Sequence, residues 1–302
     1  MKRRTFGWAA RLAIPISASL ILGVTAMAGA ASGSVGRTSH TITGPGRWTA
    51  ISETSTPDGR VTDTWRGSDG SMVSAIGPPG LHLTVVPDPD RHGPGNRTDH
   101  GVTIAIQGAG LTKKAGATAT AGAAGDLRLA RSVYSQPCFS YTNPSGHVYF
   151  YGCDTQWLDQ TYGYDWYMFD QQQVSGRSDC SQWFWCDRLT QLYNYVSYSA
   201  GNGVIQWSPD STTSVGSCRQ QMVGITSPQS GLGYSETSTV CPNTFGPYVL
   251  NSTQFGAVWN GYEGWNDDWE SSMAEDLVHN PPGYWPSFNY NMNVSWCNWC
   301  TP

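Results

Sequence analysis

The sequence predicts an all-β protein: an antiparallel, jelly-roll-like β-sandwich stapled by disulfides, with one short α-helix around residues 266–280. Three observations lead to this prediction. Residues 132–302 contain short runs in which apolar and polar side chains alternate, which is typical of strands with one buried face. Clusters of Gly, Pro, Asn and Ser separate these runs at the short spacing of antiparallel sheets. Eight cysteines, none before residue 138, indicate four disulfides in an exported chain.

An export signal is predicted over residues 1–30. Three basic residues, Lys2 to Arg4, precede an apolar stretch that ends in small residues around Ala28, which is typical of a cleavable signal peptide. The basic start also fits a twin-arginine signal, so the export route stays open. No later apolar run has the length of a membrane span. We therefore expect a secreted, extracellular protein.

Composition divides the rest of the chain. Residues 31–108 contain short strand-like runs and are expected to be a β-rich segment, a pro-region, or strands that add to the second part. Residues 109–131 are rich in Ala, Gly and Thr and predict a flexible linker. Residues 132–302 carry three Arg and no Lys against ten Asp and four Glu, and predict an acidic domain with one core. Such an acidic surface excludes nucleic acid as the partner.

Two disulfides can be predicted from hairpin symmetry, because residues opposite each other across a tight turn have a constant sum of residue numbers. Cys138 and Cys153 are symmetric about Ser145 and Gly146, and a second pair is symmetric about Gln229 and Ser230. That second pair is Cys218 and Cys241. The other four cysteines allow three pairings, which stay open: Cys180, Cys186, Cys297 and Cys300.

The helix is predicted from "GYEGWNDDWESSMAED", residues 261–276, and the residues after it. Asn266 has the chemistry of an N-cap, and two acids follow where the helix dipole favours negative charge. Three apolar residues spaced by four would share one buried face; they are Trp269, Met273 and Leu277. The acids on the other faces are expected to be solvated: Asp267, Asp268, Glu270, Glu275 and Asp276.

Several kinds of chemistry can be excluded. The sequence has no nucleophile elbow, zinc-protease motif, Walker loop or dinucleotide fingerprint. The acidic, Gly-rich stretch 88–99 lacks the ligand spacing of a calcium loop, so we expect no metal and no cofactor. His147 beside a tight turn and His279 at the end of the predicted helix both have structural explanations.

Two carboxylates remain candidates for catalysis. If Cys218 faces Cys241, Glu236 lies opposite Val223 and shares the apolar face of its hairpin. Glu263 continues the apolar phase of the strand that precedes it. A sandwich-type glycosidase would use two such carboxylates as acid and as nucleophile or base. The structural alternative is that Glu236 pairs with Arg219 and that Glu263 lies in a solvated turn.

Tryptophans in loop-like surroundings point instead to binding. Exposed indole rings flanked by Asn, Gln and Asp suit stacking on sugar rings or anchoring of a protein partner. The candidates are Trp157, Trp183, Trp185, Trp265 and Trp285, for which core packing is the structural alternative. Binding of an extracellular glycan or a cell-surface partner is favoured over glycoside hydrolysis. A toxin or inhibitor with a removable pro-segment is the third alternative.

Overall fold

The computed structural model describes residues 39–92, 98–108, 133–162, 165–178, 187–199, 203–226, 233–240, 243–261, 269–280 and 288–298. Within these ranges every regular element is a β-strand, which confirms the predicted all-β class. No helix of the described residues has the length and apolar character needed to cross a membrane. The strands are β1 (Thr41–Thr43), β2 (Trp48–Ser55), β3 (Val61–Gly67), β4 (Met72–Gly77), β5 (His82–His92), β6 (Thr98–Gly108), β7 (Val133–Ser135), β8 (Cys138–Thr142), β9 (Val148–Tyr162), β10 (Asp165–Ser178), β11 (Asp187–Tyr198), β12 (Gly203–Ser208), β13 (Thr213–Val215), β14 (Arg219–Thr226), β15 (Gly233–Val240), β16 (Asn243–Asn251), β17 (Gln254–Gly261), β18 (Glu270–Asn280) and β19 (Phe288–Asn298).

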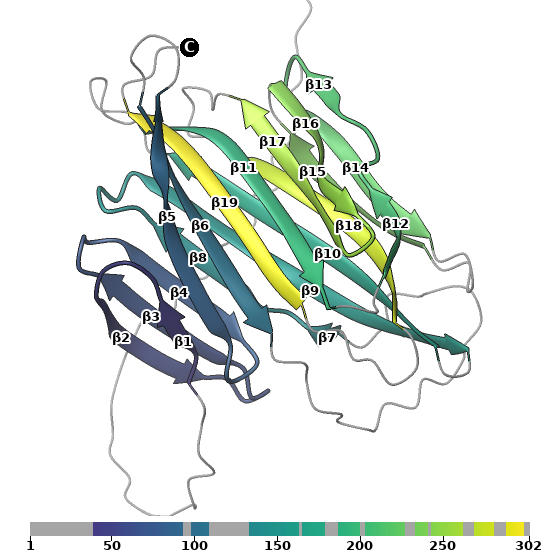
Figure 1. Ribbon diagram of the computed structural model, residues 1–302, viewed down its shortest axis with the longest axis horizontal. Helices are drawn as coiled ribbons and strands as arrows, with labels where there is room; N and C mark the ends of the chain where they lie inside the picture. Colours follow the sequence, from purple (N-terminus) through teal and green to yellow (C-terminus); the bar gives the residue numbers. More distant parts are fainter. Residues whose placement is uncertain are drawn as a thin grey trace, which may run out of the picture. The chain divides into compact units, whose positions relative to one another are not determined.

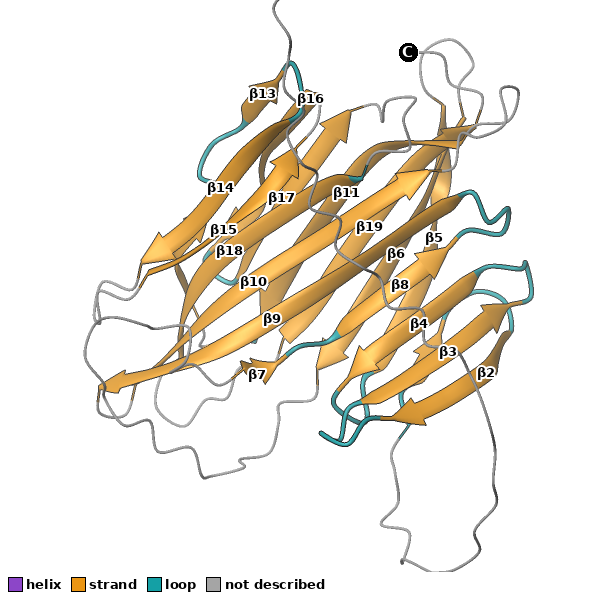
Figure 2. Ribbon diagram, turned by 180° about the vertical axis from the view of Figure 1, so that it is seen from behind, coloured by secondary structure: helices purple, strands orange, loops and turns teal. Residues whose placement is uncertain are grey.

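Two large sheets form a sandwich, as predicted (Figure 1). The eight-stranded sheet has the order β1-β5-β6-β19-β11-β17-β16-β13. The nine-stranded sheet, which faces the viewer in Figure 2, has the order β12-β18-β10-β9-β8-β4-β3-β2, with β7 paired to β9. The short β1 runs parallel to β5, and the other described pairings are antiparallel. A separate hairpin of β14 and β15 contacts β18 and β12.

The core lies between the two sheets, where alternate residues of each strand meet. Leu83, Ile104 and Trp259 of the eight-stranded sheet are fully buried, as is Phe150 of the nine-stranded sheet. The phenol of Tyr290 crosses the core and donates a hydrogen bond of 2.9 Å to the backbone oxygen of Gln173. Since packed sheets lie about 10 Å apart, side chains of this length connect the layers directly.

Gly152 of β9 marks a place where the sheets approach closely. A Cβ atom at this position would lie 2.1 Å from the sulfur of Met292 in β19. The methionine therefore occupies the space that a side chain at residue 152 would need. Glycine at this point lets the long Met292 side chain fill the core without displacing the backbone of β9.

The strands of residues 41–108 belong to both sheets. β6 pairs with β19 from Asp99–Cys297 to Gly108–Phe288. β4 pairs with β8 in the other sheet, with β3 and β2 beyond it. The first part of the chain thus completes the layers that residues 133–298 begin.

The predicted helix at 266–280 is wrong: its described residues form strand β18. This strand pairs with β10 from Gly176–Glu270 to Trp166–Asn280 and with β12 on its other edge. The residues of both faces of β18 are buried from Glu270 to Val278, because the β14–β15 hairpin covers the face turned away from the sandwich core. A strand that is buried on both faces shows no apolar–polar alternation. Because the alternation is absent, the four-residue spacing of Met273 and Leu277 fitted a helix, and the helix prediction was based on it.

The burial of β18 also corrects the expected exposure of its acids. Glu270, Glu275 and Asp276 were expected on a solvated helix surface, and all three are at most 1% exposed. His279, expected at the end of a helix, lies in the strand opposite Tyr167. The first turn of the predicted helix, Asn266 to Asp268, lies outside the described residues.

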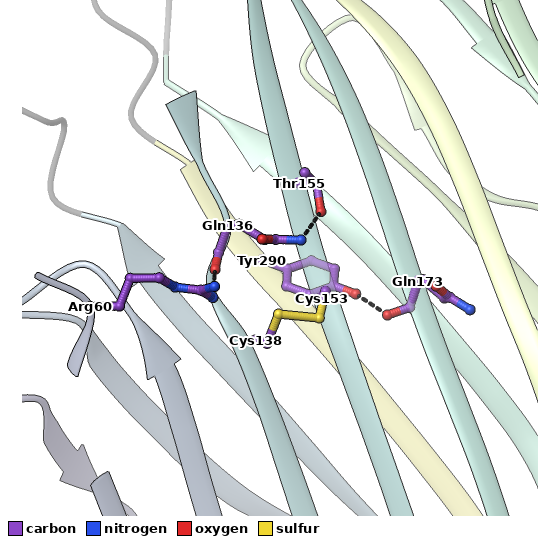
Figure 3. The surroundings of a disulfide bond; sticks show 7 residues. All are labelled: Arg60, Gln136, Cys138, Cys153, Thr155, Gln173 and Tyr290. Atoms are coloured by element: carbon purple, nitrogen blue, oxygen red, sulfur yellow. Dashed lines mark hydrogen bonds between the residues drawn. A yellow bond between two sulfur atoms is a disulfide. The ribbon is translucent and has the colours of Figure 1, made fainter. Parts of the chain in front are cut away.

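The disulfide between Cys138 and Cys153 confirms the hairpin argument (Figure 3). The two residues are register partners in β8 and β9, and the turn between them is closed by a hydrogen bond from Gly146 N to Asn143 O, with Gly146 at a φ of +79°. Nearby, Gln136 accepts a hydrogen bond from Arg60 at its backbone oxygen. This contact ties the β2–β3 region to the segment that precedes the disulfide.

Replacing both residues of this disulfide, C138S/C153S, should lower the free energy of unfolding by about 3 kcal/mol. The bond closes a loop with a sequence separation of 15, and cross-links of that size reduce the conformational entropy of the unfolded chain by about this amount. Guanidinium titration of the variant beside the oxidised protein measures the loss. C138V/C153V is the control for the polarity of serine at these half-buried positions. A loss below about 0.5 kcal/mol in both variants would contradict the expectation.

Candidate functional site

The outer face of the eight-stranded sheet is almost free of charge. Across β5, β6, β19, β11, β17 and β16 the register brings one residue in two onto this face, while the intervening residues form the core. We call this surface the tyrosine face. Its residues are His82, Thr84, Val86, Asp88, Gly101, Thr103, Ala105, Gln107, Asn289, Asn291, Asn293, Ser295, Gln191, Tyr193, Tyr195, Ser197, Gln254, Gly256, Val258, Asn260, Thr244, Gly246 and Tyr248. Among these residues Asp88 is the one carboxylate and none is Lys or Arg; toward the start of β6 the same face continues to Asp99, whose register partners are Arg91 and Cys297.

Three tyrosines form the centre of this face. The rings of Tyr193 and Tyr248 stack, with 4.4 Å between centroids and 24° between planes. Tyr195 lies 6.2 Å from Tyr193 and 6.0 Å from Tyr248. Gly256 separates Tyr195 from Tyr248 in the register, and a Cβ there would lie 2.5 Å from the Cβ of Tyr195. The glycine therefore leaves the space in which rings from two non-adjacent strands meet.

The tyrosines are half-buried although they lie on an outer face. Burial raises the pKa of Tyr193 and of Tyr195 above the ordinary value of 10. Both phenols thus stay protonated over the physiological range and keep their hydroxyl groups as hydrogen-bond donors. The cluster offers aromatic surface with neutral polar atoms at its edge.

Hydrogen bonds fix the polar side chains next to the rings. Thr103 Oγ1 donates to Asp88 Oδ1 at 2.9 Å. The side-chain amide of Asn293, the register partner of Tyr193, donates to Asp88 and to Thr103 Oγ1. Ser295 Oγ in turn donates to Asn293 Oδ1 at 3.3 Å. The donors and acceptors beside the tyrosines are therefore held in place before any ligand binds.

The tyrosine face presents aromatic rings beside neutral amides and hydroxyl groups. Glycoside hydrolysis needs two carboxyl groups, about 5–10 Å apart, on either side of the scissile bond. Asp88 and Asp99 both lie at the β5–β6 end of this face, on strands other than those of the stacked rings, and Asp88 accepts hydrogen bonds from Thr103 and Asn293. Aromatic rings with fixed amides and hydroxyls match the apolar faces and the hydroxyl groups of a sugar.

A second polar cluster lies inside the sandwich. Asp154, Asp170 and Asp276 project from the inner faces of β9, β10 and β18, and each is at most 1% exposed. Gln156 Nε2 donates to Asp154 Oδ2 and to Asp170 Oδ2, both at 3.0 Å. From the facing sheet, the Tyr198 hydroxyl donates to Asp276 Oδ2 at 2.7 Å. The cluster thus binds the two layers together.

Burial raises the pKa of each carboxyl group in this cluster. It raises the pKa of Asp170 to about 6, from an ordinary value of 3.8. The pKa values of Asp154 and Asp276 rise further, through burial and through the negative charge of Asp170. Their partners in the described hydrogen bonds are neutral amides and a phenol. Because these groups have almost no contact with solvent, they act on stability rather than on a substrate.

The residues predicted to act in catalysis lie apart from the tyrosine face or outside the described residues. Glu236 pairs with Val223 in the β14–β15 hairpin, as the hairpin symmetry requires. Val223 and Ile225 are buried whereas Met222 is 67% exposed, so the predicted phase of β14 is correct. Glu263 lies outside the described residues.

Of the five predicted binding tryptophans, Trp157 is described; it is a half-buried residue of β9. The other four lie outside the described ranges: Trp183, Trp185, Trp265 and Trp285. Cys218 and Cys297 are also disulfide-bonded. Arg219 pairs with Val240, which is the register that a Cys218–Cys241 bond requires, and that bond stays a prediction.

Within the described parts of the chain, no three His, Cys, Asp or Glu side chains are grouped so as to hold a metal ion.

Sequence reasoning missed both clusters. The buried carboxyls had a signal: Asp154 and Gln156 follow Val148 and Phe150 in the same alternating phase, which places them on the apolar face. The tyrosine face had no such signal in the sequence, because its rings come from β11 and β16, and β17 lies between these two strands in the sheet.

No protein-family model matches the chain, and no curated protein is similar to it. The tyrosine face is therefore the feature from which a function can be inferred.

Proposed function

We propose that the protein is a secreted binding protein that recognises a neutral glycan through the tyrosine face. The observation that carries this proposal is the stacked pair of Tyr193 and Tyr248 on the outer face of the eight-stranded sheet, among mostly neutral side chains. Aromatic rings bind the C–H faces of sugars, and amide and hydroxyl groups bind their hydroxyls. The predicted export signal places this surface outside the cell.

The lack of charge favours a neutral ligand. None of the residues named for the tyrosine face is Lys or Arg, so an acidic polysaccharide at the rings would approach Asp88 without a compensating cation among them. A protein partner would need a larger apolar centre, since stable interfaces contain a desolvated core of aromatic and aliphatic anchors. The amides of Asn289 and Asn291 instead lie along β19 beside the rings, and the buried Asn293 holds Asp88 and Thr103.

Rigidity supports the same function. Tyr193 and Tyr195 lie on β11, which is paired on both edges, and Tyr248 lies on β16 opposite Gly256 of β17. Little conformational entropy is lost when a ligand binds a surface that is already ordered. Modest contact areas can then give measurable affinity for an oligosaccharide.

Binding of neutral polysaccharides should be lost when the tyrosine stack is removed. We expect Y248A to weaken binding at least tenfold, which corresponds to about 1.4 kcal/mol, because it removes half of the stacked pair. Affinity electrophoresis against cellulose derivatives, xylan, mannan, galactan and β-glucan identifies a ligand, and calorimetry with its oligomer measures the change. Y248F keeps the ring and should bind nearly as well. I51A, at an exposed apolar position of the other sheet, is the matched control.

Two outcomes would contradict the proposal. One is that none of these glycans is bound. The other is that Y248A binds like the unchanged protein while its unfolding transition is normal. Release of reducing ends from a polysaccharide, with loss of that activity in both E236Q and E263Q, would support the hydrolase alternative instead.

A further inference from the structure

The nine-stranded sheet has an exposed aromatic cluster on its own outer face. Tyr149 and Tyr151 of β9, Arg177 of β10 and Trp269, which directly precedes β18, form a group that we call the arginine–tryptophan patch. Figure 2 looks onto the sheet that carries it. Trp269 is 38% exposed and Tyr151 is 37% exposed, which is unusual for side chains of this size.

The register explains why these residues meet. Tyr149 is the partner of Arg177, and Glu270 is the partner of Gly176, so Trp269 comes beside Arg177 on the other side. The indole makes edge contacts with both tyrosines, at 5.8 and 5.4 Å between centroids. The guanidinium carbon of Arg177 lies 5.1 Å from the centre of the indole ring. The arginine is thus held over the tryptophan by a cation–π interaction.

Arg177 keeps its hydrogen-bonding capacity. The side chain is exposed and lies over the indole of Trp269. Among the described residues, its guanidinium makes no ion pair and no hydrogen bond. A guanidinium has five N–H donors in a planar fork that fits a carboxylate with two parallel hydrogen bonds. Stacking on Trp269 orients that fork without using its donors.

The charge of this patch contrasts with its surroundings. Residues 132–302 have three arginines and no lysine against fourteen acids. Arg188 is buried, and Arg219 lies on the β14–β15 hairpin. An exposed cation on an aromatic platform in an otherwise acidic region favours an anionic ligand that also has an apolar face.

Hydroxyl groups surround the patch on the same face. Ser140 pairs with Tyr151 and Thr142 with Tyr149, and both are partly exposed; the Ser175 and Ser271 hydroxyls beyond them are buried and are hydrogen-bonded to each other at 2.8 Å. Hydroxyls that both donate and accept match the hydroxyl groups of a sugar better than the backbone of an acidic peptide.

We propose that the arginine–tryptophan patch binds an acidic glycan: the carboxylate of a uronic acid unit pairs with Arg177, and the sugar ring packs against Trp269 and Tyr151. This site is on the other sheet from the tyrosine face. Its ligand is acidic, whereas the ligand proposed for the tyrosine face is neutral. It does not depend on the neutral-glycan proposal.

The test uses the full chain and polygalacturonate as the probe, with calorimetry at 20 and 200 mM salt. We expect binding that weakens with salt, a loss of at least tenfold in R177Q, and a similar loss in W269A. R219Q removes an exposed arginine elsewhere and should leave the affinity unchanged, as should Y248A on the tyrosine face. Because Arg177 is exposed, R177Q decides the question even if W269A fails to fold.

Three results would contradict the binding of an acidic glycan at this patch. No binding of polygalacturonate, or equal losses in R177Q and R219Q, would overturn the proposal, because the attraction would then be absent or a general charge effect. Stronger binding of poly-aspartate than of polygalacturonate would identify an acidic peptide as the ligand and would also overturn it.

Discussion

A chain that starts at residue 132 should fail to fold, although that part contains every cysteine. Without the first part, β19 loses β6 as a partner, and β8 loses β4. The core loses Trp65, Val73 and a group of aliphatic residues that are at most 2% exposed: Leu83, Val85, Val102, Ile104 and Ile106. Each such side chain contributes roughly 1.5–3 kcal/mol by burial, so the seven together account for roughly 10–21 kcal/mol, which is as large as the 5–15 kcal/mol stability of an ordinary domain.

Expression of residues 132–302 alone measures this effect through solubility, near-ultraviolet circular dichroism and thermal unfolding. We expect an aggregated or unfolded product. As a control, the full chain with an engineered protease site within 109–131 should stay together after cleavage and separate only in denaturant, since no cysteine precedes residue 138. A soluble second fragment with a cooperative transition would contradict the prediction and favour a removable pro-region.

The stability of the folded protein should fall as the pH rises from 4 to 7. Folding raises the pKa values of Asp154, Asp170 and Asp276 above their ordinary value of 3.8, and that of Asp170 reaches about 6. Well below pH 3.8 the carboxyl groups are protonated in both states. Above it the unfolded chain loses these protons first, so ionisation favours unfolding until the folded groups also ionise.

For Asp170 alone the shift corresponds to a loss on the order of 3 kcal/mol between pH 4 and 7. In a domain of this size that loss lowers Tm by about 6–12 °C. Thermal unfolding at pH 4, 5, 6 and 7 measures the slope. D170N replaces the carboxyl group with an amide that cannot ionise, and its Tm should fall less over this range. D210N, at an exposed position, should keep the slope of the unchanged protein. A Tm that stays level or rises toward pH 7 would show that the cluster does not control stability.

Patterns of neighbouring residues in the sequence predicted much of the fold but did not predict the tyrosine face. Alternation along the chain predicted the β-sandwich, and the symmetry of one tight turn predicted the Cys138–Cys153 bond. The helix prediction failed at β18 because a hairpin distant in the sheet order covers its second face, which no local pattern reports. The tyrosine face depends on which strands lie side by side, and Tyr193 and Tyr248 become neighbours through non-local pairing.

The place of β19 in the sheet has a kinetic consequence. This strand, the last one described, lies between β6 and β11 in the middle of the eight-stranded sheet. Asn293 and Thr103, which are hydrogen-bonded across that junction, are 190 positions apart in the sequence. Contacts of such long range slow folding, because the intervening chain must be closed into a loop before they form. One edge of β6 therefore stays open to wrong partners until β19, which lies far along the chain, has been inserted.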